Sequence, residues 1–262
     1  MMNHELEVAL SAAREAGVLL RARFGETPDV KEMFAHDIKL DLDVQSQELI
    51  TGRLLNAFPG HALYGEEGIA GNQASEWQWI VDPIDGTVNY FYGIPHFCIS
   101  IALRRVIASA KDGGEIQLGV IYDPMRDEMW QVVRGGVATL NGKTIRVSSR
   151  TQISEAMLSV GFAKSQETIA TGLPMFDYFI TRARKCRLMG SAALDLAYVA
   201  CGRLDAYIES SVSLWDVAAG MLLVEAAGGT FEMTPRKDNP DKISVRASSG
   251  CMDLSTPIDG RL

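Results

Sequence analysis

Apolar residues recur at steps of three and four residues in several stretches of the chain, a spacing typical of helices with one buried face. The first series runs from Leu6 to Phe24 and is followed by Gly25, which predicts a helix over residues 4–24 that ends at the glycine. The same pattern predicts further helices over residues 43–57, 166–183, 191–201 and 215–227.

Between about residue 60 and residue 150, short apolar stretches predict strands instead. The predicted strands cover residues 62–64, 77–82, 97–104, 117–122, 128–133 and 137–147. Within the last of these, Asn141-Gly142 is a strong signal for a two-residue hairpin turn.

The second half alternates strands with helices, which predicts a layered α/β structure. Its predicted strands cover residues 156–161, 204–209 and 243–247. A boundary falls near residue 150 without a flexible linker. We therefore expect an N-terminal α+β part (1–150) and a C-terminal α/β part (151–262) that form one compact unit, with ligand bound between them.

The composition is that of an ordinary globular protein, with 47% hydrophobic and 22% charged residues among 262. The formal net charge is −8, and acids and bases are mixed along the chain, which does not favour binding to nucleic acid. This charge would also repel a phosphorylated ligand. A phosphate site here therefore requires bound cations that reverse the local sign.

We expect a cytoplasmic protein. The first residues lack the basic and apolar segments of a secretory signal, and charged residues interrupt the apolar runs before they reach membrane-spanning length. The four cysteines show no CxxC spacing, so free thiols are expected rather than disulfides or a zinc site.

Two carboxylates, Asp82 and Asp85, stand three residues apart where the predicted strand 77–82 ends. Acids at a strand end project hard oxygen ligands into a cleft, and Mg2+ prefers such ligands. Gly86 lets the backbone approach closely, so its N–H and that of Thr87 can face an oxyanion. This segment predicts a combined metal and phosphate site.

Other acids are candidate partners of this pair. Glu66-Glu67 directly follows the predicted strand 62–64, one strand earlier in the chain. Asp216 opens the predicted helix 215–227, where an acid can also serve simply as an N-cap.

Three more acids, Asp37, Asp41 and Asp43, lie before or at the start of the second predicted helix. An EF-hand loop starting at Asp41 would need Gly at its sixth position and Glu at its twelfth, where the chain has Ser46 and Gly52. One of the three acids is a candidate to point into the cleft. The others are expected to be surface charge or a helix cap.

Several common catalytic motifs do not fit. The acids of haloacid dehalogenase phosphatases stand two residues apart instead of three, and the glycines before Lys143-Thr144 are one residue too far apart for a P-loop. The four histidines show no HxxH or HExxH spacing, and no GxSxG motif occurs. Zinc hydrolysis and serine-esterase chemistry are therefore unsupported.

Together these motifs resemble the inositol monophosphatase family. Its three signatures appear in order as Gly65-Glu66-Glu67, as Trp79 to Asn89, and as Trp215-Asp216 running to Gly229. Segments 190–193 and 205–209 also match the family's substrate side, and the resemblance spans about residues 5–250.

The resemblance implies a layered αβαβα sandwich of the inositol monophosphatase and fructose-1,6-bisphosphatase type, usually as a homodimer. It also implies hydrolysis of small phosphomonoesters by a metal-activated water, with two to three Mg2+ ions per site. This chemistry is demanding, because enhancements of such hydrolysis reach ~10^21. Without a nucleophilic Ser, Cys or His motif, metals held by carboxylates are the expected source of attack.

The resemblance also implies the metal ligands. One ion would be held by Glu66, Asp82 and the Ile84 carbonyl, a second by Asp82, Asp85 and Asp216, and a third, weaker one by Glu66 together with Glu67.

The remaining site residues carry catalytic and binding roles by the same resemblance. Thr87 and Asp43 would help Glu66 to orient and deprotonate the water. The phosphate and the substrate hydroxyls would be bound by Gly86, Thr87, Asp85, the Ala192 backbone and Glu209.

Inositol 1-phosphate is the expected substrate, because the Glu209 carboxylate can accept hydrogen bonds from neighbouring hydroxyls of a polyol. Histidinol phosphate, fructose 1,6-bisphosphate and 3'-phosphoadenosine 5'-phosphate stay open as alternatives. A non-catalytic regulatory protein of the same fold is a hypothesis of another class, although the expected ligands are all present. The chain departs from the family at Lys39-Leu40, where Thr is usual before Asp43.

Overall fold

The computed structural model describes residues 2–26, 30–33, 38–107, 113–162, 166–236, 239 and 242–255. The helices are α1 (Asn3–Arg23), α2 (Asp41–Ala57), α3 (Thr87–Phe91), α4 (Gln166–Ile180), α5 (Ala192–Ala200) and α6 (Leu214–Ala226), with a 3-10 turn at Ile153–Glu155. A two-stranded hairpin of β1 (Val30–Met33) and β2 (Ile38–Leu40) leads directly into α2.

The larger sheet has eight strands in the order β10-β9-β8-β7-β6-β5-β3-β4. They are β3 (Ala62–Gly65), β4 (Gly68–Gly71), β5 (Trp77–Asp85), β6 (Cys98–Val106), β7 (Gly114–Asp123), β8 (Glu128–Val133), β9 (Thr139–Leu140) and β10 (Lys143–Thr144). Neighbours are antiparallel except β3 and β5, which run parallel.

The smaller sheet has five strands in the order β12-β11-β13-β15-β14. They are β11 (Met157–Gly161), β12 (Lys185–Arg187), β13 (Ala206–Val212), β14 (Thr230–Pro235) and β15 (Ile243–Ser248). β11 runs parallel to both of its neighbours, and β15 runs antiparallel to both of its own.

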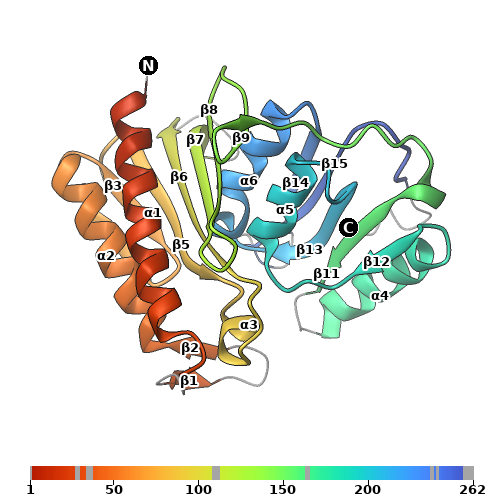
Figure 1. The fold of residues 1–262 in the computed structure, drawn as a ribbon, viewed down its shortest axis with the longest axis horizontal. Helices are drawn as coiled ribbons and strands as arrows, with labels where there is room; N and C mark the ends of the chain where they lie inside the picture. The colour runs from red at the N-terminus through yellow and green to blue at the C-terminus, as the bar shows by residue number, and fades with distance from the viewer. Residues whose placement is uncertain are drawn as a thin grey trace.

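The elements form five layers (Figure 1). α1 and α2 cover one face of the larger sheet, α5 and α6 lie between the two sheets, and α4 covers the far face of the smaller sheet. This αβαβα sandwich confirms the predicted fold. The strands of the larger sheet precede residue 150 and those of the smaller sheet follow it. Whether the two parts form a single compact unit stays a prediction.

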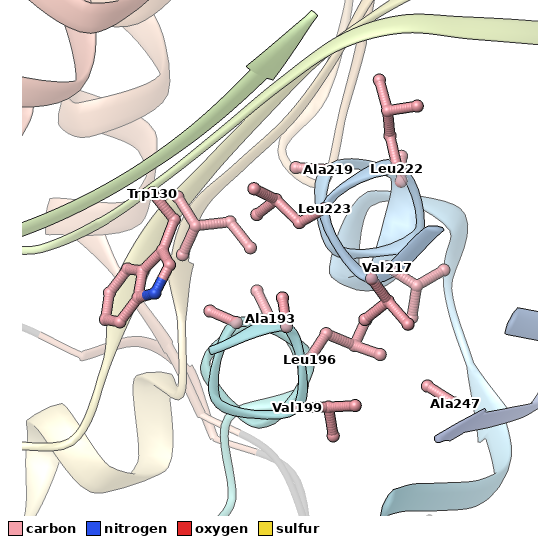
Figure 2. Close-up of a cluster of buried hydrophobic side chains, with 14 of the residues drawn as sticks. Trp130, Ala193, Leu196, Val199, Val217, Ala219, Leu222, Leu223 and Ala247 are labelled. Carbon is pink, nitrogen blue, oxygen red and sulfur yellow. The ribbon is translucent and has the colours of Figure 1, made fainter. Parts of the chain in front are cut away.

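The central hydrophobic core holds the middle layer in place. Leu196 of α5 and Leu223 of α6 lie in one buried cluster with Trp130 of the larger sheet and Ala247 of the smaller one (Figure 2). Truncation of such a leucine to Ala typically costs about 2–5 kcal/mol. Because α6 is wedged between the sheets, the position of its first turn, with Asp216, is set by packing.

The predicted strand 137–147 is wrong in extent. Only β9 and β10 form there, as a hairpin around Asn141-Gly142, and this turn is confirmed by positive φ angles of 48° and 76°. After β10 the chain leaves the sheet and crosses to the second part, where the Val147 N–H donates to the Ala227 carbonyl (3.2 Å). Because the Val147 N–H is bonded to a residue outside the larger sheet, Val147 does not continue the strand of β10.

The sequence pattern also missed α3, β1, β2, β4, β12 and β14. These elements are short, or they lie at sheet edges, where one face packs weakly and alternation is indistinct. β14, for example, contains no fully buried residue.

In the part of the chain that the structure describes, no helix is both long and apolar enough to cross a membrane. All four cysteines are free thiols, as expected.

Candidate functional site

A cavity of about 540 Å3 is lined by residues from both sheets. The larger sheet and α3 contribute Glu66, Asp82, Ile84, Asp85, Gly86, Thr87, Val88 and Asn89, and the second part contributes Gly161, Phe162, residues 188–192, Asp195, Glu209, Ser211, Val212 and Asp216. The cavity therefore brings together nine predicted site residues from distant segments. Asp43 and Glu67, which were also predicted, do not line it.

A β-bulge at the end of β5 places Asp82 and Asp85 on the same side of the sheet. Residues three apart on a regular strand point to opposite faces. Here Asp82 pairs with Ser100 and Asp85 with Cys98, so three steps along β5 match two steps along β6. The extra residue restores a common direction, and both carboxylates line the cavity.

Gly86 joins β5 to α3 in the left-handed region, with a φ of 98°. A Cβ at this position would lie 3.0 Å from the His96 carbonyl oxygen, so conformation and space both favour glycine here. Asn89 of α3 donates to the carbonyls of His96 (2.8 Å) and Met189 (2.9 Å). This side chain ties the turn to the loop before α5 in the second part.

Thr87 and Asp43 contact each other beside the cavity. The Thr87 hydroxyl donates to the Ile84 carbonyl (2.8 Å) and lies 3.2 Å from Asp43 Oδ1. Asp43 is 2% exposed, and its Oδ2 accepts from the Leu40 N–H (2.7 Å). The donor is the backbone N–H of Leu40. This hydrogen bond therefore forms even though the chain has Lys39-Leu40 where the family usually has Thr.

Of Asp37, Asp41 and Asp43, Asp43 in the first turn of α2 is therefore the one that reaches the site. Asp41 is exposed at the start of the helix, and Asp37 lies outside the described residues.

Asp85 links the larger sheet to the N-terminus of α5. Its carboxylate accepts from the Ser191 hydroxyl and from the backbone N–H groups of Ala192 (3.1 Å) and Ala193 (2.7 Å). The Ala192 N–H, predicted to face the substrate, is thus engaged by Asp85 in this structure. The carboxylate also satisfies helix donors that have no partner within α5.

Asp216 occupies the third position of α6, behind the N-cap residue Ser213. Its Oδ2 accepts from the Ser213 N–H (2.7 Å), which is one half of a capping box. The Lys242 ammonium donates to the Ser213 hydroxyl (2.6 Å). Asp216 is thus not the N-cap itself but the N3 residue of the capping box, and its side chain also lines the cavity. Its role as a metal ligand stays a prediction.

Glu66, Asp82, Asp85 and Asp216 form what we call the acidic cluster. Asp82 is central, because the charges of Glu66, Asp85 and Asp216 all act on it. Its Oδ1 accepts from the Ile84 N–H (3.0 Å).

Burial and mutual repulsion raise the pKa values of the acidic cluster. Burial, then the charges of Asp216, Asp43 and Glu67, raise the pKa of Glu66 to about 8. Burial and the charge of Asp85 raise the pKa of Asp216 to about 7. Burial and the neighbouring acids also hold the pKa of Asp82 well above its ordinary value.

Asp195 and Glu209 form a second acid pair in the cavity. Glu209 Oε2 accepts from the Tyr207 hydroxyl (2.6 Å), and Asp195 Oδ2 accepts from the Ser159 hydroxyl (2.6 Å). Burial raises the pKa of Glu209 to about 7 and that of Asp195 well above its ordinary value.

Sequence reasoning missed Asp195, and it included Ser191 and Tyr207 only within the matching segments 190–193 and 205–209, without a role of their own. Asp195 did carry a signal, because it is an acid inside an otherwise apolar helical segment, 192–200. The role of Ser191 depends on its contact with the distant Asp85, which the local pattern does not contain. Tyr207 stands two residues before Glu209 on β13, a spacing that places both side chains on one face of the strand.

The acidic cluster fits Mg2+ in ligand type and in charge. Within the described residues, no group of three His, Cys, Asp or Glu side chains is arranged to hold an ion as it stands. The donor atoms are nevertheless hard carboxylate oxygens, as Mg2+ prefers. The cluster is strained by like charges, which a divalent cation would neutralise.

The fold and the site together define a class of protein. The inositol monophosphatase family model matches residues 1–252, and the chain belongs to this family. The recognition made from the sequence is thereby confirmed.

Individual relatives carry two kinds of name. The chain is 41% identical to the Nus factor SuhB of Xylella fastidiosa, over 87% of this chain and 82% of that protein. It is 38% identical to inositol monophosphatase 1 of Solanum lycopersicum, over 86% and 83% of the two chains. The solved inositol monophosphatase of Anabaena superposes with a TM-score of 0.78 at 35% identity, covering 94% of this chain and 90% of that one.

Proposed function

We propose that the chain hydrolyses a small phosphomonoester, inositol 1-phosphate, to inositol and phosphate in a Mg2+-dependent reaction with water. The acidic cluster carries this proposal. Four carboxylates line a cavity large enough for a small metabolite, and burial together with the charges of neighbouring acids raises the pKa values of Glu66, Asp82 and Asp216. Such a cluster is of use to the protein mainly when cations occupy it.

The ligands assigned by the family resemblance suit two ions. Glu66, Asp82 and the Ile84 carbonyl would hold one, and Asp82, Asp85 and Asp216 would hold the other. The central position of Asp82 between Glu66 and Asp216 supports its role in both sets. When bound, Mg2+ makes water a better nucleophile near neutral pH and neutralises charge on the phosphoryl group.

The chain's own groups can receive the proton of that water. Thr87 Oγ1 lies within hydrogen-bonding distance of both Asp43 and the Ile84 carbonyl, so its proton can be held on the protein side. Its lone pairs are then free to accept from a water in the cavity. Asp43 keeps the hydroxyl oriented, and Glu66, which lines the same cavity, would take up the proton of the water.

The second acid pair supports a polyol as the leaving group. Tyr207 engages Oε2 of Glu209, which leaves Oε1 to accept from a substrate hydroxyl. The backbone N–H of Ala192 could bind a substrate oxygen only after it is released from Asp85.

The test is release of inorganic phosphate with and without Mg2+ from inositol 1-phosphate, histidinol phosphate, fructose 1,6-bisphosphate and 3'-phosphoadenosine 5'-phosphate. We expect Mg2+-dependent turnover, strongest with inositol 1-phosphate. Preference for another compound would replace the substrate and keep the mechanism. If the folded protein released no phosphate from any of them, the proposed activity would be wrong. The homodimer implied by the family stays a separate prediction.

The names of the relatives favour a second candidate, a regulatory role through protein binding. Several similar proteins are named Nus factors, so we propose that partner binding accompanies catalysis. The two roles separate in a strain that lacks the gene. Rescue of its phenotype by the Asp216→Asn variant would show that turnover is dispensable, whereas failure of rescue would favour catalysis.

A further inference from the structure

Lys39 and Glu67 form an ion pair beside the acidic cluster. The Lys39 ammonium lies 3.4 Å from Glu67 Oε1, and the side chain of Glu67 is only 6% exposed. A buried carboxylate is costly unless it is paired. The lysine therefore stabilises a charge that solvent reaches poorly, directly next to the predicted metal ligand Glu66.

The backbone on both sides of this pair is fixed by Gln47 of α2. Its Oε1 accepts from the Glu67 N–H (2.9 Å), and its Nε2 donates to the Gly68 carbonyl (3.2 Å). Because β2 runs directly into α2, Lys39 and Gln47 belong to one continuous segment. Segment 39–47 thus fixes the backbone of the β3–β4 turn through Gln47, and it also supplies the Lys39 ammonium that pairs with Glu67.

Glu67 also differs from the acidic cluster in where it lies. Glu66, Asp82, Asp85 and Asp216 line the cavity, and Glu67 does not. Its charge is still felt at Glu66, where it helps to raise the pKa. An ammonium fixed at Glu67 reduces this repulsion without any metal ion.

We propose that Lys39 is a built-in counter-cation for Glu67, which keeps this carboxylate out of the metal-ligand set and limits the site to two divalent ions. The inference rests on the proposed metal-dependent function. It also replaces the expectation that Glu67 helps to hold a third ion. The physical reason is that a divalent ion at Glu67 would stand close to the lysine's positive charge and be repelled.

The test is a count of bound Mn2+ by electron paramagnetic resonance. The signal reports the Mn2+ that stays free in solution, and the number of ions bound per chain follows by difference from the total added. We expect two ions in the wild-type chain and a third, weaker one in Lys39→Met, which removes the charge and keeps an apolar stem. Lys39→Arg should retain two ions, so the third ion should bind at least about tenfold more weakly there than in Lys39→Met. Lys31→Met, an exposed lysine of the same hairpin, is the matched control and should also retain two.

A second variant tests the same idea from the other partner. Glu67→Gln should leave the count at two if Glu67 is not a ligand, and Glu67→Gln in the Lys39→Met background should abolish the third ion. A wild-type count of three, or an unchanged count of two in folded Lys39→Met, would overturn the inference while the proposed function stands. A folded wild-type chain that binds no Mn2+ would overturn both.

Discussion

The two groups of acids in the cavity differ in the charged groups that surround them. In the second pair, Glu209 and Asp195 each accept from a neutral hydroxyl, that of Tyr207 or Ser159. In the acidic cluster, Asp82 instead lies between other carboxyls. Hydroxyls of the protein thus hold one oxygen of each acid in the second pair, and Asp195 Oδ1 stays buried without a hydrogen-bond partner among the described residues, whereas repulsion between the carboxylates of the cluster favours protons or cations there. This difference separates the part of the cavity that should do chemistry from the part that should recognise substrate.

The two groups meet at Asp85. This carboxylate belongs to the acidic cluster, yet three donors at the start of α5 hold it, as hydroxyls hold the second pair. Those hydrogen bonds oppose the rise of its pKa that burial causes. Asp85 is thus the point at which the smaller sheet and its helices influence the metal side.

The largest effect should come from removing one charge of the acidic cluster. Asp216→Asn keeps the size of the side chain and an oxygen for the Ser213 N–H, so the fold should persist. Loss of an electrostatic group in the reacting site lowers kcat by about 10^3. Phosphate release measures this fall in kcat, and thermal unfolding checks the fold.

The matched control is Asp41→Asn, which changes an exposed acid at the start of α2 and should keep full activity. Equal activity in Asp216→Asn would remove this residue from the metal site.

The next effect concerns stability without metal. The folded-state pKa values of Glu66 (about 8) and Asp216 (about 7) lie above their ordinary values of 4.5 and 3.8. Between roughly pH 4 and pH 8 the folded chain therefore binds more protons than the unfolded chain. The free energy of unfolding should then fall as pH rises, by an amount on the order of a few kcal/mol.

Urea unfolding at several pH values, with EDTA or with Mg2+, measures this fall. Mg2+ should flatten it, since bound cations favour the ionised carboxylates that protons otherwise neutralise. If the two series of unfolding curves shifted identically with pH, the contrast between the two acid groups would be wrong.

The sequence pointed to Asp82, Asp85 and Thr87, which line the cavity, because they stand in one short segment. Asp82 to Thr87 follow a clear apolar strand, and the chemistry of acids, glycine and threonine can be read locally. What spacing alone could not show is the bulge that turns Asp82 and Asp85 to the same side, because a regular strand would have opposed them.

The other side of the cavity was harder to predict. Glu209 and Ala192 came from the family resemblance, and Asp195 was passed over as part of a helix. Their neighbours Ser159 and Tyr207 are brought together by the parallel pairing of β11 with β13, which no local pattern encodes. The predicted strand 137–147 failed for a similar reason, since a contact with Ala227 ends it.

A smaller effect should follow from loosening the link between the two groups. Ser191→Ala removes one of three donors to Asp85 and leaves both backbone N–H groups in place. The loss of one hydrogen bond to a charged group predicts about a tenfold fall in kcat or in Mg2+ affinity. Titration of activity against Mg2+ distinguishes the two. Ser191→Thr keeps the hydroxyl and should recover most of the activity, which a purely steric role would not explain.

The smallest effect should be confined to substrate recognition. Glu209→Gln keeps an oxygen for hydrogen bonding but removes the charge, so KM for inositol 1-phosphate should rise by about five- to tenfold with little change in kcat. p-Nitrophenyl phosphate, which has no hydroxyl to bind, should be hydrolysed as by the wild-type chain. The Glu209 side chain packs directly against Gly161, since a Cβ on this glycine would lie 1.7 Å from Glu209 Oε2. Gln has nearly the same volume as Glu and should fit in the same space. An equal loss with both substrates would mean that Glu209 acts on the metal side, because only the reacting phosphate is common to them.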